Sequence, residues 1–287
     1  LTSSPRPTFS SLAPPAMPPL LSPAESVDPS LSDISFSAEN YLGTSTADLQ
    51  DSLAAEDPAL LDALSAAAPS LLALVDAASR LLRVGSVAPS AMPLAVHLLH
   101  ARVVGPDAGE EELDALDDAA LDMLVTVLLA GASYLVEPGV AWRAVETLGA
   151  LAQAPGPARR ISVPLNLASH LAASLSRFPS ALRLHVAVCR LTAALFAGGL
   201  DFPSNAFAIM TPSVAAAIAD HGGDRDLVLA ASRALTYLVN DSESSRKEAG
   251  RSQLVADLST AIAAFPGDED VLDAALRVTA AVLRHDK

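Results

Sequence analysis

Aromatic side chains are scarce in this sequence: they make up 4% of the 287 residues, whereas apolar residues as a whole make up 51%. The core must therefore be built from Ala, Leu and Val. That composition favours close-packed helices over a β-sandwich, which depends on β-branched and aromatic side chains. No segment shows a convincing strand pattern. The length allows one or two ordinary domains or a single elongated repeat array.

Cysteine occurs once, at Cys189, which excludes an intrachain disulfide. Its place in an Ala/Leu/Val segment beside Arg190 predicts a small core or groove residue rather than a reactive thiol. A long apolar run is also absent. The longest uncharged stretch, Met123–Val136, has 14 residues, short of the roughly 20 needed to cross a bilayer. We therefore expect a buried helix there and no membrane span.

Positive charge is the third scarcity: 18 Lys and Arg stand against 33 Asp and Glu, which gives a net charge of −15. We therefore do not expect the chain to bind nucleic acid or an anionic membrane through bulk electrostatics. With a single cysteine and no signal-peptide pattern, we expect an intracellular, cytoplasmic protein. No Met precedes Leu1, so we also expect a piece of a longer polypeptide.

Proline is concentrated near the N-terminus, where eight of the 21 prolines precede residue 30 among Ser and Ala. A segment with so little continuous apolar surface does not offset its ordering entropy. The composition predicts a disordered linker over residues 1–45. A helical repeat domain is predicted over residues 46–287, with its clearest repeats over residues 113–287.

Short helices joined by turns are predicted within the first part of that domain. Asp57-Pro58 is typical of a helix N-cap followed by Pro at the first helical position. A helix is predicted from about Ser70 to Val84, with Gly85 as its stop, and another from Ser90 to Gly105. The acidic stretch 110–114 predicts the first turn of a third helix, because carboxylates suit the positive end of the helix dipole.

Internal repetition is the strongest signal in the second half. A small residue recurs at spacings of 43, 44 and 43, at Ala144, Ala187, Ala231 and Ala274. Four positions later a large apolar residue recurs at the same spacings, at Leu148, Leu191, Leu235 and Val278. The helix before each also repeats in step. Two helices and a turn repeating at this period predict an α-solenoid, in which stacked neighbours bury each other's apolar faces.

This pattern resembles the armadillo repeat family. Residues 246–258, followed by residues 271–283, are similar to one armadillo repeat with a short first helix, a glycine turn and two further helices. Residues 228–238 carry the family's third-helix pattern, V-x-x-A-x-x-A-L-x-x-L. The resemblance covers roughly residues 113–287 and implies an all-α, right-handed α-solenoid. HEAT repeats, which have two helices at a similar period, remain an alternative. The choice between armadillo and HEAT repeats also stays open for residues 46–112.

In this family the third helices line a concave groove that binds extended peptides. The resemblance implies partner-binding candidates in the third helices: Arg143, Glu146, Arg190, Arg233, Tyr237 and Arg277. The import adaptors of the family use an array of Asn and Trp there. The positions that match the Asn hold Ala150, Ala193, Tyr237 and Ala280, and those that match the Trp hold Glu146, Cys189, Arg233 and Leu276. Binding of basic import signals is therefore not expected.

The chain lacks the motifs of common enzymes: a G-x-S-x-G elbow, a P-loop, a G-x-G-x-x-G turn after a strand and H-E-x-x-H. His97 and His100 share a helix face, but no second pair completes a metal site. We expect no catalytic residues, cofactor, metal or small-molecule substrate. The predicted function is a non-catalytic scaffold that binds a protein or peptide segment. The alternatives are a co-factor of a heat-shock chaperone that promotes nucleotide exchange, and a regulatory solenoid tail of a larger protein such as a kinase.

Overall fold

The fold is built from helices, as the periodicity of the sequence predicts. The structure is a computed structural model, and it describes residues 45–83, 89–105, 110–133, 137–154, 166–197, 204–241, 243–251 and 253–284. Within these ranges there are helices, turns and bends but no strand, so the all-α prediction is confirmed. The predicted disordered linker, apart from Ser45, lies outside the described residues, as does Gly85.

The described helices cover nearly all of the ranges given above. Their bounds are α1 Thr46–Glu56, α2 Pro58–Ala67, α3 Leu71–Arg83, α4 Ala91–Val104, α5 Glu110–Asp114, α6 Asp118–Ala132, α7 Pro138–Gln153, α8 Leu167–Arg177, α9 Leu182–Ala197, α10 Ser204–His221, α11 Arg225–Asp241, α12 Glu243–Arg251, α13 Leu254–Ala264 and α14 Glu269–Leu283. The last three cover the segments that resemble a single armadillo repeat.

Short polar side chains fix where several helices begin. Asp57 accepts a hydrogen bond from the Leu60 backbone N–H at 3.0 Å, and Pro58 follows it in the first helical turn. Asp117 and Asp268 cap α6 and α14 in the same way. Each such cap stabilises its helix by about 1 kcal/mol. The predicted start of α2 is therefore confirmed.

The acidic stretch after Gly105 differs from its prediction in one respect. It forms the short helix α5, but the chain leaves the helix at residues 115–117 and begins again as α6. The reason is local: Asp117 adopts an extended backbone conformation, and its side chain accepts from the Ala120 N–H at 2.8 Å. One predicted helix is thus two. The predicted helices near residues 70–84 and 90–105 are confirmed as α3 and α4.

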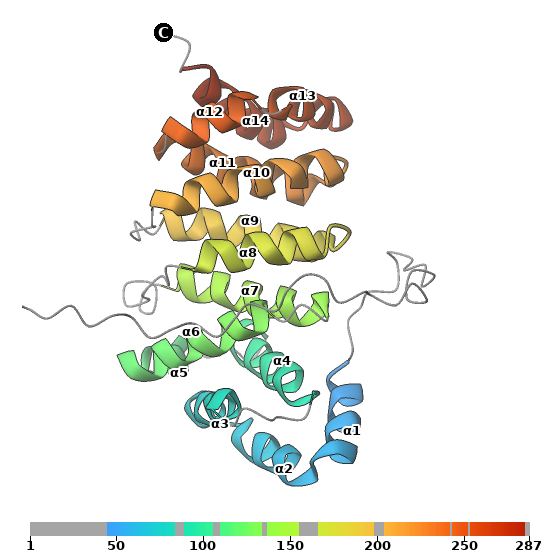
Figure 1. The fold of residues 1–287 in the computed structure, drawn as a ribbon, viewed down its shortest axis with the longest axis vertical. Coiled ribbons are helices and arrows are strands. Elements are labelled where there is room, and N and C mark those ends of the chain that lie inside the picture. Colours follow the sequence, from blue (N-terminus) through green and yellow to red (C-terminus); the bar gives the residue numbers. More distant parts are fainter. Residues whose placement is uncertain are drawn as a thin grey trace, which may run out of the picture. The chain divides into compact units, whose positions relative to one another are not determined.

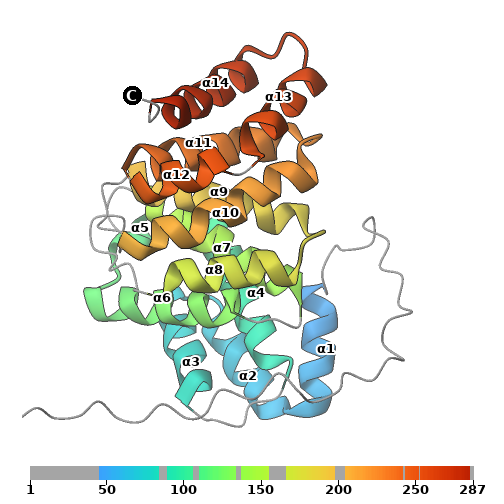
Figure 2. The ribbon, with the colours of Figure 1, turned by 45° about the horizontal axis from the view of Figure 1, so that its top comes forward.

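The helices after α3 pack in two rows. In the first row α4, α7, α9, α11 and α14 contact one another in that order. In the second row α6, α8 and α10 contact one another in order, and α10 contacts both α12 and α13. Helices of one row also contact those of the other, as α6 does α7 and α10 does α11. Figure 1 shows α6 to α11 following one another in chain order along its vertical axis, and Figure 2 shows the helices from a second direction.

The small residues that recur in the sequence lie inside this stack. Ala144 and Ala231 are fully buried, and Ala187 and Ala274 are 6% and 9% exposed. They lie in α7, α9, α11 and α14, the successive helices of the first row. A small side chain lets neighbouring helices approach closely. Gly131 in α6 shows how close: a Cβ added there would lie 2.7 Å from Val96 Cγ2 and 3.1 Å from Ala144 Cβ.

Polar contacts between turns hold one edge of the stack in register. His221, at the end of α10, has its Nε2 2.7 Å from the carbonyl oxygen of Pro179, in the turn before α9. Arg225, at the start of α11, donates from Nε to Asp268 Oδ2 at 2.5 Å in the turn before α14. Each contact joins one helix pair to the next. The first row is therefore aligned so that its helices begin along a common edge.

Candidate functional site

Two cavities open along the first row of helices. One, of about 590 Å³, is lined by α7 and α9 together with Val104 of α4 and the start of α11. The other, of about 860 Å³, is lined by α9 and α11 together with the end of α7 and the start of α14. Gln153, Arg190 and Asp226 line both. The two cavities therefore adjoin at these residues, and together we call them the groove.

The floor of the groove is made of small residues. Those that line it are Gly149, Ala150, Ala187, Ala193, Ala194, Ala197 and Ala230. Larger apolar side chains stand among them, including Val186 and Leu229. Such a floor lets a ligand approach the helix backbones closely and contact apolar surface over a long distance. Charged and aromatic side chains provide the specific features of the walls.

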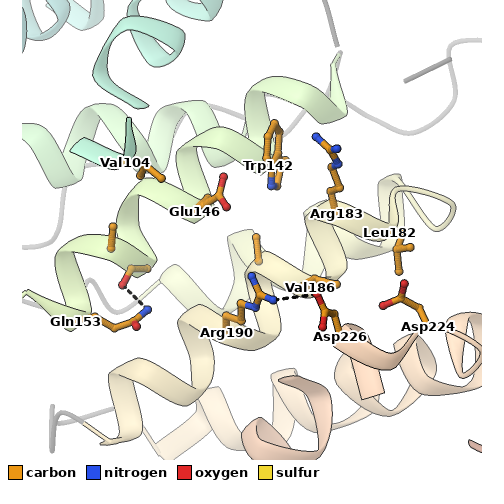
Figure 3. Close-up of a pocket in the computed structure, with 13 residues that line it drawn as sticks. Val104, Trp142, Glu146, Gln153, Leu182, Arg183, Val186, Arg190, Asp224 and Asp226 are labelled. Carbon is orange, nitrogen blue, oxygen red and sulfur yellow. Dashed lines mark hydrogen bonds and ion pairs between the residues drawn. The ribbon is translucent and has the colours of Figure 1, made fainter. Parts of the chain in front are cut away.

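Trp142, on α7, is the main aromatic feature of the first cavity. The Arg143 Cζ lies 4.9 Å from the centroid of its ring and the Arg183 Cζ, from α9, lies 5.2 Å from it. These are distances at which a guanidinium is attracted to the ring face. The His100 ring lies 5.6 Å away. Figure 3 shows Trp142 and Arg183 facing the same cavity from adjacent helices. Trp142 was not among the predicted residues, although it is the only Trp in the sequence.

Glu146 lies one turn after Trp142 and is held by a helix from the previous pair. Its Oε2 is 2.8 Å from His100 Nε2 on α4. The hydrogen bond from His100 lowers the pKa of Glu146. Burial acts in the opposite direction, but together with the smaller effects of Arg190 and Arg183 the hydrogen bond keeps the pKa lowered. The carboxylate is therefore ionised at neutral pH and fixed in the cavity wall.

Arg190 stands where the two cavities meet. Its Nη2 lies 3.4 Å from Asp226 Oδ2, so the pair joins α9 to α11 across the groove floor, as the dashed line in Figure 3 shows. Both side chains are more than half exposed. An ion pair this exposed is worth at most about 1 kcal/mol. It orients the two side chains without locking them.

The second cavity has its own aromatic and charged features. Tyr237, which is 36% exposed, stacks on Phe196 of α9 with the ring centroids 6.1 Å apart and the planes 10° from parallel. Arg233 lies one turn earlier on α11 and is exposed. Arg225 pairs with Asp270 at 3.0 Å as well as with Asp268. The aromatic stack thus joins the walls of α9 and α11.

The structure brings four of the six predicted partner-binding residues into the groove: Glu146, Arg190, Arg233 and Tyr237. Arg143 does not line either cavity; it is half-buried behind Trp142 and donates to the Gly139 carbonyl at 3.1 Å. Arg277 lines neither cavity and pairs at 2.8 Å with Asp273, one turn earlier on α14. The repeat spacing alone did not separate these two positions from the others.

Cys189 marks where the spacing argument fails by one residue. Sequence matching set Cys189 beside Glu146 and Arg233, but its side chain is fully buried and Arg190 faces the groove instead. Burial raises the pKa of the Cys189 thiol to about 12. Of the two predicted environments, groove or core, the structure selects the core.

No metal or membrane feature emerges from the part of the chain that the structure describes. His97 and His100 share α4, but no three His, Cys, Asp or Glu side chains there are grouped to hold an ion. His97 is buried, and its Nδ1 lies 3.4 Å from Thr46 Oγ1. Among the same residues, no helix has the length and apolar character that crossing a bilayer requires.

Comparison with known proteins informs the fold alone. No protein-family model and no curated protein matches the chain. Among solved structures, the chain is similar to the crystal structure of an engineered protein determined by the Northeast Structural Genomics Consortium. The two are 16% identical with a TM-score of 0.50, over 83% of this chain and 96% of the other. At that identity the likeness concerns the helical architecture and carries no functional information.

Proposed function

We propose that the stack is a right-handed α-solenoid of armadillo-like or HEAT-like repeats, and that the protein is a non-catalytic scaffold that binds an extended partner segment in the groove. The observation that supports this most directly is that the two cavities of the groove adjoin along the first row, at the shared residues Gln153, Arg190 and Asp226. A solenoid offers an extended surface of this kind because each repeat adds one helix to it.

The dimensions suit an extended peptide. Neighbouring helices pack about 9 Å apart, so the groove from α7 to α14 spans roughly 27 Å across three such spacings. An extended chain advances about 3.4 Å per residue, which corresponds to about eight residues. The small floor residues leave room for the backbone of such a segment, and Trp142 and Tyr237 offer aromatic contacts along its length.

A selection of random displayed peptides against the full chain tests the proposal. The groove is filled in one variant by Ala150→Trp together with Ala193→Trp, two half-buried floor positions. The matched control is Ala216→Trp, an exposed position beside a cavity of the second row. We expect enriched peptides to bind the unmodified chain and the control but not the filled variant. Circular dichroism confirms that all three chains are folded.

Two results would count against the proposal. Peptides that bind the filled variant as tightly as the unmodified chain would show that the groove is not the binding surface. An experimental structure in which successive helices of the first row turn in a left-handed sense would contradict the solenoid assignment.

A further inference from the structure

The groove differs in charge from the rest of the chain. Eight charged side chains line it, four carboxylates and four guanidiniums, although acids outnumber Lys and Arg by 33 to 18 overall. The carboxylates are Glu146, Asp224, Asp226 and Asp270, and the guanidiniums are Arg183, Arg190, Arg225 and Arg233. Their balance alone does not decide the partner. The charge of the partner is instead indicated by which of these side chains already form ion pairs or hydrogen bonds within the chain.

Every carboxylate in the groove already has a partner within the chain. Glu146 lies 2.8 Å from His100 Nε2, and Asp226 pairs with Arg190. Asp270 pairs with Arg225 at 3.0 Å, and Asp224 accepts from the Leu227 backbone N–H at 2.8 Å. A basic partner would therefore have to compete with hydrogen bonds and ion pairs that exist before it binds.

The arginines divide evenly. Arg190 and Arg225 take part in the ion pairs just described, whereas Arg183 and Arg233 make no ion pair with any described residue. Arg183 rests near the face of Trp142, with its Cζ 5.2 Å from the ring centroid. Arg233 is exposed one turn before Tyr237. The groove thus holds two arginines without an ion pair, one of them over the Trp142 ring, in a chain whose net charge is −15.

We infer that the segment bound in the groove carries Asp or Glu side chains whose carboxylates pair with Arg183 and Arg233. This inference rests on the proposed function and names the chemistry of the partner. Carboxylate recognition suits a guanidinium, which offers several N–H donors in one plane. At Arg183 the Trp142 ring limits the motion of the guanidinium, so less entropy is lost when the carboxylate binds.

The overall negative charge of the chain adds selectivity to this arrangement. An acidic segment is repelled by the rest of the surface and attracted only where the unengaged arginines lie. Exposed repulsions are screened by salt over about 8–10 Å. Added salt weakens both the attraction and the repulsion, so the peptide selection is carried out at one fixed, physiological ionic strength.

The test uses peptides enriched by the selection described above and substitutions that each remove one positive charge. Arg183→Gln and Arg233→Gln alter the groove. Arg284→Gln, at the exposed C-terminal end of α14 and outside both cavities, changes the net charge equally and serves as the control. Affinity is measured by fluorescence anisotropy with an enriched peptide and with the same peptide carrying Gln in place of each Asp and Glu.

We expect the enriched peptides to be acidic. Arg183→Gln and Arg233→Gln should each weaken binding by about fivefold, the upper range for an exposed ion pair, and together by about 25-fold if the two sites are independent. Arg284→Gln should leave the affinity unchanged. The Gln-substituted peptide should bind weakly to every chain, with no further loss in the two groove variants.

The failures of the two proposals are distinguishable. Basic or neutral peptides that lose binding only in the groove-filled variant would leave the scaffold function standing and overturn the acidic partner. Equal affinity for acidic and Gln-substituted peptides would do the same. A phosphoserine version that binds more than about tenfold tighter than its Glu counterpart would replace carboxylate with phosphate as the ligand, since phosphate also pairs with guanidinium. Binding that survives filling of the groove would overturn the function itself.

Discussion

The two rows of helices present cavities of very different chemistry. The groove along the first row is lined by eight charged side chains, Trp142 and Tyr237. The cavity of the second row, about 220 Å³, lies between α10, α12 and α13, and its one charged lining residue is Asp257. The other residues that line it are Thr211, Pro212, Ala215, Ala216, Ala219, Ala249 and Leu254.

The difference teaches which surface can distinguish one partner from another. Apolar contacts are not directional, so a cavity lined by Ala, Pro and Leu offers area but little specificity. Guanidinium, carboxylate and indole groups have preferred geometries and fix the orientation of a ligand. The same helical packing supports both surfaces. Only the residues that point away from the shared core differ.

The largest expected effect concerns Cys189, which lies in the interior directly behind the groove. Cys189 is next to Arg190 in sequence but fully buried, and its pKa is raised from 9.0 to about 12. At neutral pH this leaves roughly a thousandfold less thiolate than an ordinary cysteine has. We expect alkylation of the folded chain to be slower than that of the urea-unfolded chain by about this factor. Because the chain has one cysteine, all labelling reports on this site.

Labelling of the folded chain as fast as that of the unfolded chain would show that Cys189 faces the groove.

The second prediction compares the two sides of α11. Leu235 is fully buried, whereas Leu229 lies half-buried in the groove wall. Leu235→Ala should lower the free energy of unfolding by about 3 kcal/mol, because a cavity remains in the core. Leu229→Ala should lower it by about 1 kcal/mol, because less apolar area is lost. Urea denaturation measures both, and equal losses would contradict the assignment of these two faces.

The third prediction concerns His97 in α4, the helix that packs against α7, which carries Trp142. Burial lowers the pKa of His97 from 6.5 to about 4, with smaller effects of Arg143 and His100. As pH falls below 6.5, the unfolded chain binds this proton before the folded chain does. Stability due to His97 is therefore fully present above pH 6.5 and is lost between pH 6.5 and about 4, by about 3 kcal/mol. His97→Phe should reduce this slope in urea midpoints measured across the interval, and the remainder comes from His185, whose pKa burial also lowers.

His170→Gln provides the control, since His170 is half-buried and hydrogen-bonds to Ser133. A slope that is undiminished in His97→Phe would assign the pH dependence to other groups.

The smallest expected effect sharpens the comparison of the two cavities. Asp226→Asn releases Arg190 from its ion pair and should raise affinity for an acidic peptide by about threefold. Asp257→Asn removes the same charge from the second-row cavity and should leave the affinity unchanged. Fluorescence anisotropy with one enriched peptide measures both. Equal gains would mean that net charge, rather than the groove, controls binding.

Much of the fold was predictable from local signals. Asp57-Pro58 predicted the start of α2, and Ser90 and Gly105 bounded α4, because caps and stops act within a few residues. The break between α5 and α6 was missed, since it depends on competition between helix continuation and a new cap at Asp117. The recurrent Ala residues predicted buried positions in successive helices of the first row, and all four are buried.

The groove was predictable only in part. The resemblance to armadillo third helices led to Glu146, Arg190, Arg233 and Tyr237, which line it, but also to Arg143 and Arg277, which do not. Trp142 and Arg183 were missed because they meet across two helices, and no feature of either segment indicates the other. Which arginine finds a carboxylate is likewise invisible in the sequence, since Arg225 pairs with Asp268 across 43 positions.

The sequence by itself determined that this protein is helical, where several helices begin and which small residues they bury, because propensity, capping and apolar period are properties of neighbours along the chain. Only the tertiary structure decided which side of α9 faces the groove and which charges remain unengaged there. The physical reason is that a rotation of one residue about a helix axis, about 100°, changes the environment of every side chain, and packing against the adjacent helices sets that rotation.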